Sequence, residues 1–132
     1  MALAFHLPEF DEEQSIRLTK MIMRLFEHWQ LTYEQQAIFL GLSTNTRSSI
    51  NRYKKGTSHI RLNQDTYDRI TFFLSIHKSL RALFPMNLDL AYKWIKEPNL
   101  HFDHKAPIQI IAEEGFLGLV KVHDYLENVK AR

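Results

Sequence analysis

The segment from Thr32 to Gly56 constrains the fold more than any other part of the chain. It contains two short helical patterns that meet at Gly41, with the small residue Ala37 four positions earlier. A small side chain lets two helices approach closely, and glycine tolerates the backbone of a tight turn. Thr32 and Gln35 have the spacing of a capping box, which marks a helix start. The segment therefore predicts a helix-turn-helix. The apolar side chains expected to bury its corner are Ile38, Leu40, Leu42 and Ile50.

The second helix of this motif is strongly basic. It is expected to begin at a cap supplied by Ser43 or Thr44 and to end at Gly56. Between Gln35 and Gln64 there is no Asp or Glu, whereas five Lys and Arg residues occur there. Lysine and arginine bind phosphates, and arginine and asparagine pair with guanine and adenine edges, so the segment predicts DNA binding. The candidate DNA-contacting residues are Thr44, Asn45, Arg47, Ser48, Asn51, Arg52, Lys54, Lys55 and Arg61.

Two positions depart from the usual helix-turn-helix pattern. Gln36 and Arg47 stand where such motifs usually bury apolar side chains. This leaves open weak or dimer-dependent DNA binding. A symmetric dimer that reads two half-sites would add specificity that one small module lacks.

The composition indicates a folded protein without catalytic or metal chemistry. The chain has 132 residues, 45% of them hydrophobic, a formal net charge of +2 and no cysteine. It has no glycine-rich nucleotide loop, and the adjacent Glu113 and Glu114 would not face each other on a helix. His101, Asp103 and His104 lack a second ligand pair at fixed spacing. We expect a soluble cytoplasmic protein that is not an enzyme and uses no cofactor or metal.

Apolar spacing predicts helices along the rest of the chain and no strand. The fold class is therefore expected to be all-α, with a helix-turn-helix bundle (residues 1–62), linking helices (63–86) and a small helical region (87–132). Trp29 is expected in the core, and Val120 and Tyr125 are expected to leave apolar surface on the last helix. The expected helices are Asp11 to Gln30, Gln64 to about Pro85, a short helix capped by Asn87, Pro107 to Glu113, and one starting near Phe116.

The last third of the chain carries a family resemblance. The stretch from Trp94 to Leu126 resembles the C-terminal toxin-binding segment of the Xre/MbcA/ParS antitoxins, and the helix-turn-helix resembles the Xre-like half of that family. The family commonly has glycine in the loop before Pro107, where this chain has Asp103, His104, Lys105 and Ala106. The positions that carry the match are Trp94, Pro98, Asn99, Pro107, Ile108, Gly115, Val122 and Leu126.

This resemblance implies a type II antitoxin paired with a RES-domain toxin, an enzyme that consumes NAD. Its C-terminal half would cover the toxin's active site, and its N-terminal half would bind promoter DNA for autoregulation. The partners implied are the toxin, double-stranded promoter DNA, and a second copy or a toxin-antitoxin hetero-oligomer. Apolar anchors and cations on the last helix and tail suit a cleft built for a phosphate-bearing dinucleotide. The candidate toxin-binding residues are Trp94, Phe116, Leu117, Lys121, Tyr125, Lys130 and Arg132.

Two other functions are compatible with the same residues. A stand-alone helix-turn-helix repressor would share the DNA-binding half. A protein-interaction module would keep the C-terminal half without binding DNA. A stoichiometric protein partner separates the antitoxin from the repressor, and salt-dependent DNA binding separates it from the interaction module.

Overall fold

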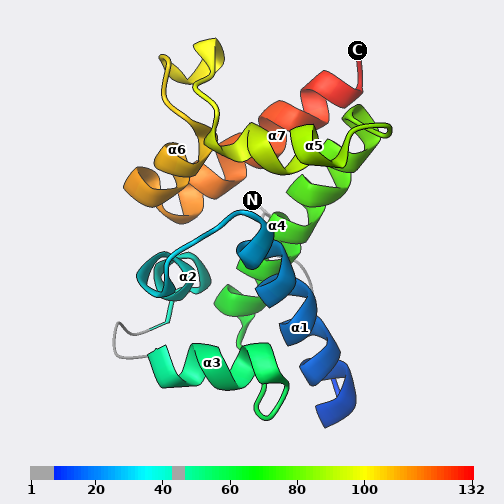
Figure 1. The fold of residues 1–132 in the computed structure, drawn as a ribbon, viewed down its shortest axis with the longest axis vertical. Helices are drawn as coiled ribbons and strands as arrows, with labels where there is room; N and C mark the ends of the chain where they lie inside the picture. Colours follow the sequence, from blue (N-terminus) through cyan, green and yellow to red (C-terminus); the bar gives the residue numbers. More distant parts are fainter. Residues whose placement is uncertain (1–7, 43–46) are drawn as a thin grey trace. The chain divides into compact units, whose positions relative to one another are not determined.

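The computed structural model describes residues 8–42 and 47–132, and every regular element in these ranges is helical. This confirms the all-α prediction. The chain divides into two compact units, residues 1–71 and 72–132. The helices are α1 (Glu12–His28), α2 (Tyr33–Leu40), α3 (Arg47–Lys55), α4 (Gln64–Leu83), α5 (Leu88–Lys93), α6 (Pro107–Glu114) and α7 (Phe116–Lys130), with single 3-10 turns at Trp94–Lys96 and Leu100–Phe102 (Figure 1).

The first unit is built on α1, which starts and ends almost where the sequence predicts. Asp11 caps it, because its side chain accepts the Gln14 backbone N–H at 2.7 Å while the Gln14 side chain accepts the Asp11 N–H. Ile22, Phe26 and Trp29 follow at helical spacing and are fully buried. The prediction that Trp29 is a core residue is therefore confirmed.

The helix-turn-helix corner forms around α2 and Gly41. Thr32 and Gln35 make the expected capping box, and Gly41 closes α2 in the left-handed region at φ 72°. Leu40 and Ile50 are fully buried. The predicted burial of Ile38 is wrong, because 52% of this residue is exposed. The buried face of α2 is formed instead by Gln36, Ala37, Phe39 and Leu40, while Leu42 is half-buried.

A polar side chain is buried in this corner at one of the two unusual positions. Gln36 is almost completely buried, and its Nε2 donates a hydrogen bond of 3.0 Å to the Leu31 carbonyl. Burying an amide is tolerated when its polar atoms are paired, and this bond satisfies part of that need. Arg47, at the other position, is exposed.

A buried threonine ties α1 to the chain that leaves α3. Thr19 Oγ1 donates to the Ser15 carbonyl at 2.8 Å and accepts the Ile60 N–H at 3.0 Å. Three residues later Asn63 caps α4 by accepting the Thr66 N–H at 2.8 Å. The segment between α3 and α4 is thus held at its middle and at its last residue by side-chain hydrogen bonds.

In the second unit, α6 and α7 lie side by side (Figure 1). Their close approach requires Gly118, because a Cβ atom at this position would lie 2.3 Å from the Ile110 carbonyl oxygen. Pro107 stands in the first turn of α6, as predicted, and the Gln109 side chain accepts the Ala106 N–H. Asn87 caps α5 by accepting the Leu90 N–H.

The burial of α7 corrects one prediction. Val120 was expected to leave apolar surface free, but only 7% of it is exposed. The reason is that α7 is buried on a wider arc than its main apolar stripe, with Gly118, Leu119, Val120, Val122 and Leu126 all buried. Tyr125 is half-buried and belongs to an aromatic cluster described below.

Candidate functional site

The predicted DNA-contacting side chains lie on α3 and on the segment that follows it. Arg47, Ser48, Arg52, Lys54 and Lys55 are exposed on α3, and Arg61 is exposed after it. Asn51 is half-buried. Two predicted DNA contacts, Thr44 and Asn45, lie outside the described residues. The predicted caps of α3, Ser43 or Thr44, lie outside them as well.

Sequence reasoning missed a tyrosine that contacts three of these side chains. Tyr33 opens α2, and its hydroxyl donates to Asn51 Oδ1 at 2.8 Å. The guanidinium carbon of Arg47 lies 4.7 Å from the centre of the same ring, and Lys54 Nζ lies 5.0 Å from it. Cations at such distances are attracted by the ring. Tyr33 therefore connects the start of α2 to the basic face of α3.

In the second unit, two predicted toxin-binding residues meet in an aromatic cluster. The rings of Trp94 and Tyr125 stack with centres 6.1 Å apart and planes 14° apart. The ring centre of His101 lies 4.4 Å from that of Tyr125, and the ring centre of Phe102 lies 5.3 Å from it. The cluster joins the Trp94–Lys96 turn, the loop before α6, and α7.

The loop before α6 is folded back on itself. The Asn99 N–H donates to the Lys105 carbonyl at 3.1 Å, and the His104 N–H donates to the Asn99 carbonyl at 3.0 Å. Asp103 and His104 have φ angles of 56° and 64°. This is the left-handed region that favours glycine, and aspartate and histidine are among the other residues that tolerate it best. The chain therefore reaches a conformation typical of glycine without a glycine.

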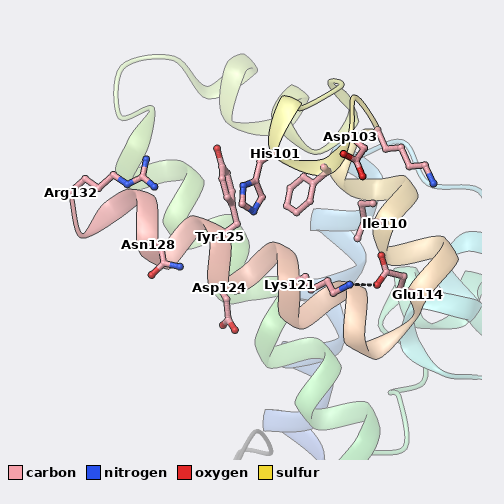
Figure 2. A pocket seen from close by; sticks show the side chains of 11 residues that line it. His101, Asp103, Ile110, Glu114, Lys121, Asp124, Tyr125, Asn128 and Arg132 are labelled. Carbon is pink, nitrogen blue, oxygen red and sulfur yellow. Dashed lines mark hydrogen bonds and ion pairs between the residues drawn. The ribbon is translucent and has the colours of Figure 1, made fainter.

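A cavity of about 550 Å³ opens beside the aromatic cluster. Figure 2 shows His101 and Tyr125 close together in it, Arg132 and Asn128 at one end, and Asp103 and Glu114 toward the other. The lining residues come from the loop, α6, α7 and the C-terminal residue. They are His101, Phe102, Asp103, Lys105, Ile110, Glu114, Lys121, Asp124, Tyr125, Asn128 and Arg132.

Three cations lie at the rim of this cavity, and two of them are paired. Lys121 forms an ion pair with Glu114, and Lys105 forms one with Glu113 at 2.8 Å. The hydrogen bond and charge of Glu113 raise the pKa of Lys105 above its ordinary value of 10.5. Arg132 is exposed and forms no ion pair with any residue that the structure describes.

The remaining predicted toxin-binding residues differ in accessibility. Leu117 is exposed, whereas Phe116 is half-buried with its ring edge against Phe72 at 5.6 Å. Lys130 pairs with Glu127 at 3.0 Å. Among the described residues, sequence reasoning missed further exposed apolar side chains in this unit. They are Met86, Leu88, Leu90 and Leu100.

In residues 8–42 and 47–132 no three His, Cys, Asp or Glu side chains come together as metal ligands would. Within the same ranges no helix is long and apolar enough to cross a membrane.

Comparison with known proteins assigns both units. Residues 18–75 match the family model of the antitoxin Xre-like helix-turn-helix domain, and residues 79–132 match that of the antitoxin Xre/MbcA/ParS C-terminal toxin-binding domain. The chain is also 28% identical over 120 residues to the uncharacterized protein y4oB of Sinorhizobium fredii (strain NBRC 101917 / NGR234), which covers 91% of this chain and 89% of that protein. The order of the two matched domains is the one that the sequence resemblance predicts. The chain therefore belongs to the Xre/MbcA/ParS antitoxins, a non-enzymatic family in which a helix-turn-helix precedes a C-terminal domain that binds a toxin.

Proposed function

We propose that this antitoxin neutralises a RES-domain, NAD-consuming toxin by covering its active site, and that its helix-turn-helix binds promoter DNA for autoregulation. The second unit would supply the toxin contact and the first unit the DNA contact. Neither task needs chemistry by the antitoxin itself.

The observation that carries the toxin proposal is the position of Arg132. It lies at the rim of a cavity lined by aromatic rings and has no carboxylate partner in the described part of the chain. A toxin that consumes NAD has a cleft for a dinucleotide with two phosphates, and an unpaired guanidinium complements such a cleft. Lys105 and Lys121 are less suited to this role because each already forms an ion pair with a glutamate.

The toxin experiment starts with a mild-salt affinity purification of the N-terminally tagged chain from its native cells. A second protein should elute in near-stoichiometric amount, and it should consume NAD only after it is separated from the antitoxin. Elution of the chain alone would remove the toxin proposal.

The purified pair then allows a test of the tail. Arg132→Gln is expected to weaken inhibition of the toxin about tenfold or more, the effect of losing an important interface side chain. The matched control is Arg81→Gln, the same change at an exposed position on α4 away from the cavity. Deleting residues 131–132, which follow α7, should act like Arg132→Gln and leave the helix intact. Unchanged inhibition by both variants would show that the tail does not occupy the active site.

The DNA proposal is supported by the exposed cations of α3 and by the absence of Asp and Glu from the sequence between residues 35 and 64. A chain that binds duplex DNA should lose affinity as salt increases, with a slope near −0.9 per phosphate contact. No binding to duplex DNA, alone or with the toxin, would favour the protein-interaction module. The match of residues 79–132 to a toxin-binding domain already disfavours a stand-alone repressor.

A further inference from the structure

Three residues on one face of α3 are gathered by a single side chain from α2. Arg47, Asn51 and Lys54 are spaced four and three residues apart, so they lie on the same side of the helix. Tyr33 contacts all three, through a hydrogen bond to Asn51 and through its ring to the two cations. A nine-residue helix that is mostly exposed has little else to fix its polar side chains.

The hydrogen bond holds the Asn51 amide beside Tyr33. The tyrosine hydroxyl donates to Oδ1, so the oxygen end of the amide is held at Tyr33 and the Nδ2 end is directed away from that hydroxyl. An amide oxygen has two lone pairs, so Oδ1 can still accept a second hydrogen bond. Asn51 thus offers one donor end and one acceptor at fixed positions.

A fixed amide has a consequence for base recognition. Adenine presents N7 as an acceptor and N6 as a donor in the major groove, which matches one amide donor and one amide acceptor. Guanine presents two acceptors, N7 and O6, and offers nothing to the amide oxygen. An amide can read either pattern only if it lies beside the base edge, and the bond to Tyr33 restricts where it lies. Reversing the amide would keep a bond to Tyr33, because the tyrosine oxygen can also accept from Nδ2, so the contact fixes the position of the amide.

We propose that Tyr33 is a specificity-determining positioning residue, which fixes the position of the Asn51 amide for base recognition and holds Arg47 and Lys54 beside it. This inference rests on the proposed DNA binding by α3. It adds that part of the base preference is set by a residue outside α3, on the neighbouring helix.

The informative variant is Tyr33→Phe, because it keeps the ring beside Arg47 and Lys54 and removes only the hydroxyl. The matched control is Tyr67→Phe, a half-buried tyrosine in the same unit whose ring packs against Phe10. The full chain, with and without its toxin, is used to select preferred duplexes from a randomised library, and affinities are then measured on single-base variants of the selected sequence.

The expected result is a change confined to one base pair in each half-site. Asn51→Ala should abolish the base preference there, and Tyr33→Phe should reduce that preference about three- to tenfold, the effect of losing one hydrogen bond. Preferences at other positions, the thermal melt and the Tyr67→Phe control should stay unchanged. In the Asn51→Ala background, Tyr33→Phe should have no further effect.

Three results would overturn the inference, and they are distinguishable. If the wild type selects a sequence and Tyr33→Phe selects it equally well, Tyr33 does not set specificity. If Tyr33→Phe weakens all positions equally, or adds its full effect to Asn51→Ala, its role is structural. If the wild type selects no sequence and binds no duplex, the proposed DNA binding itself fails, and the inference fails with it.

Discussion

Replacing Thr19 by valine tests how the first unit holds the chain that leaves the DNA-contacting helix. Thr19 is buried, and its hydroxyl accepts the N–H of Ile60, a residue that is itself fully buried. Valine has nearly the same shape but cannot accept a hydrogen bond. The Ile60 N–H would therefore be left unpaired in a site that water does not reach.

The expected cost follows from that single unpaired donor. Leaving a buried donor unsatisfied costs about 1–3 kcal/mol. The methyl group that replaces the hydroxyl gains back less than about 1 kcal/mol from burial. We expect Thr19→Val to lower the free energy of unfolding of this unit by about 1–2 kcal/mol, or about 5 °C or more in melting temperature for a domain of this size. Thr19→Ser, which keeps the hydroxyl and loses a methyl, should retain the Ile60 bond.

The assay is urea unfolding followed by the fluorescence of Trp29, in a Trp94→Phe background so that the signal comes from the first unit. Hydrogen exchange of the Ile60 amide is the second readout, because only loss of this bond should speed it selectively. If Thr19→Val unfolds at the wild-type midpoint and the Ile60 amide stays protected to the same extent, the assignment of Thr19 as a structural tether is wrong.

Three further predictions concern single contacts in the two units. Arg52→Ala should weaken binding to duplex DNA and leave the melting temperature unchanged, because Arg52 is exposed and its side chain bonds only to Ser49 Oγ among the described residues; a drop in melting temperature would instead make it structural. Glu127→Ala should lower the free energy of unfolding in urea by about 1 kcal/mol or more, since the buried Ser79 hydroxyl loses its acceptor. Ser79→Ala should cost less because it removes the hydroxyl instead of leaving it unpaired, and an equal loss in the two variants would contradict this reasoning. The hydrogen bonds of Lys130 and Ser79 lower the pKa of Glu127 below its ordinary 4.5. This carboxylate therefore stabilises the fold above pH 4.5, and the stabilisation is lost as the pH falls through the lowered pKa. The free energy of unfolding measured from pH 6 to pH 3 should fall less steeply in Glu127→Gln than in the wild type, and parallel curves would exclude the effect.

Local signals in the sequence predicted the helix-turn-helix well. The capping box of Thr32 and Gln35, the left-handed turn at Gly41 and the acid-free stretch around α3 each depend on residues close together in the chain. Hydrogen bonds over three residues and the backbone freedom of glycine are local properties, so sequence alone is enough to place them.

Burial was harder to predict where a helix is covered on more than one side. An apolar stripe identifies one buried face, but Val120 lies off the stripe of α7 and is buried all the same. The reverse error occurred at Ile38, whose apolar side chain is exposed, while the nearby Gln36 is buried and donates a hydrogen bond to the Leu31 carbonyl. Side-chain type predicts burial only on average, since the contacts of the folded chain decide each case.

The contact between Tyr33 and Asn51 could not be predicted at all from the sequence. The two residues are separated by 18 positions and belong to different helices. Their meeting depends on the angle at which α2 and α3 pack, which no periodicity contains. The same holds for the cluster of Trp94, His101 and Tyr125, whose members come from three separate elements.

The packing at Gly118 has a consequence for how this antitoxin can evolve. Because any side chain at this position would collide with the Ile110 carbonyl, the present distance between α6 and α7 can be kept only with glycine there. The cavity is lined by Ile110 and Glu114 of α6 and by Lys121 and Tyr125 of α7, so the distance between these helices sets its width. Adaptation to a changing partner is thereby directed to side chains at the rim and at the C-terminus, where one substitution alters charge or shape without moving a helix.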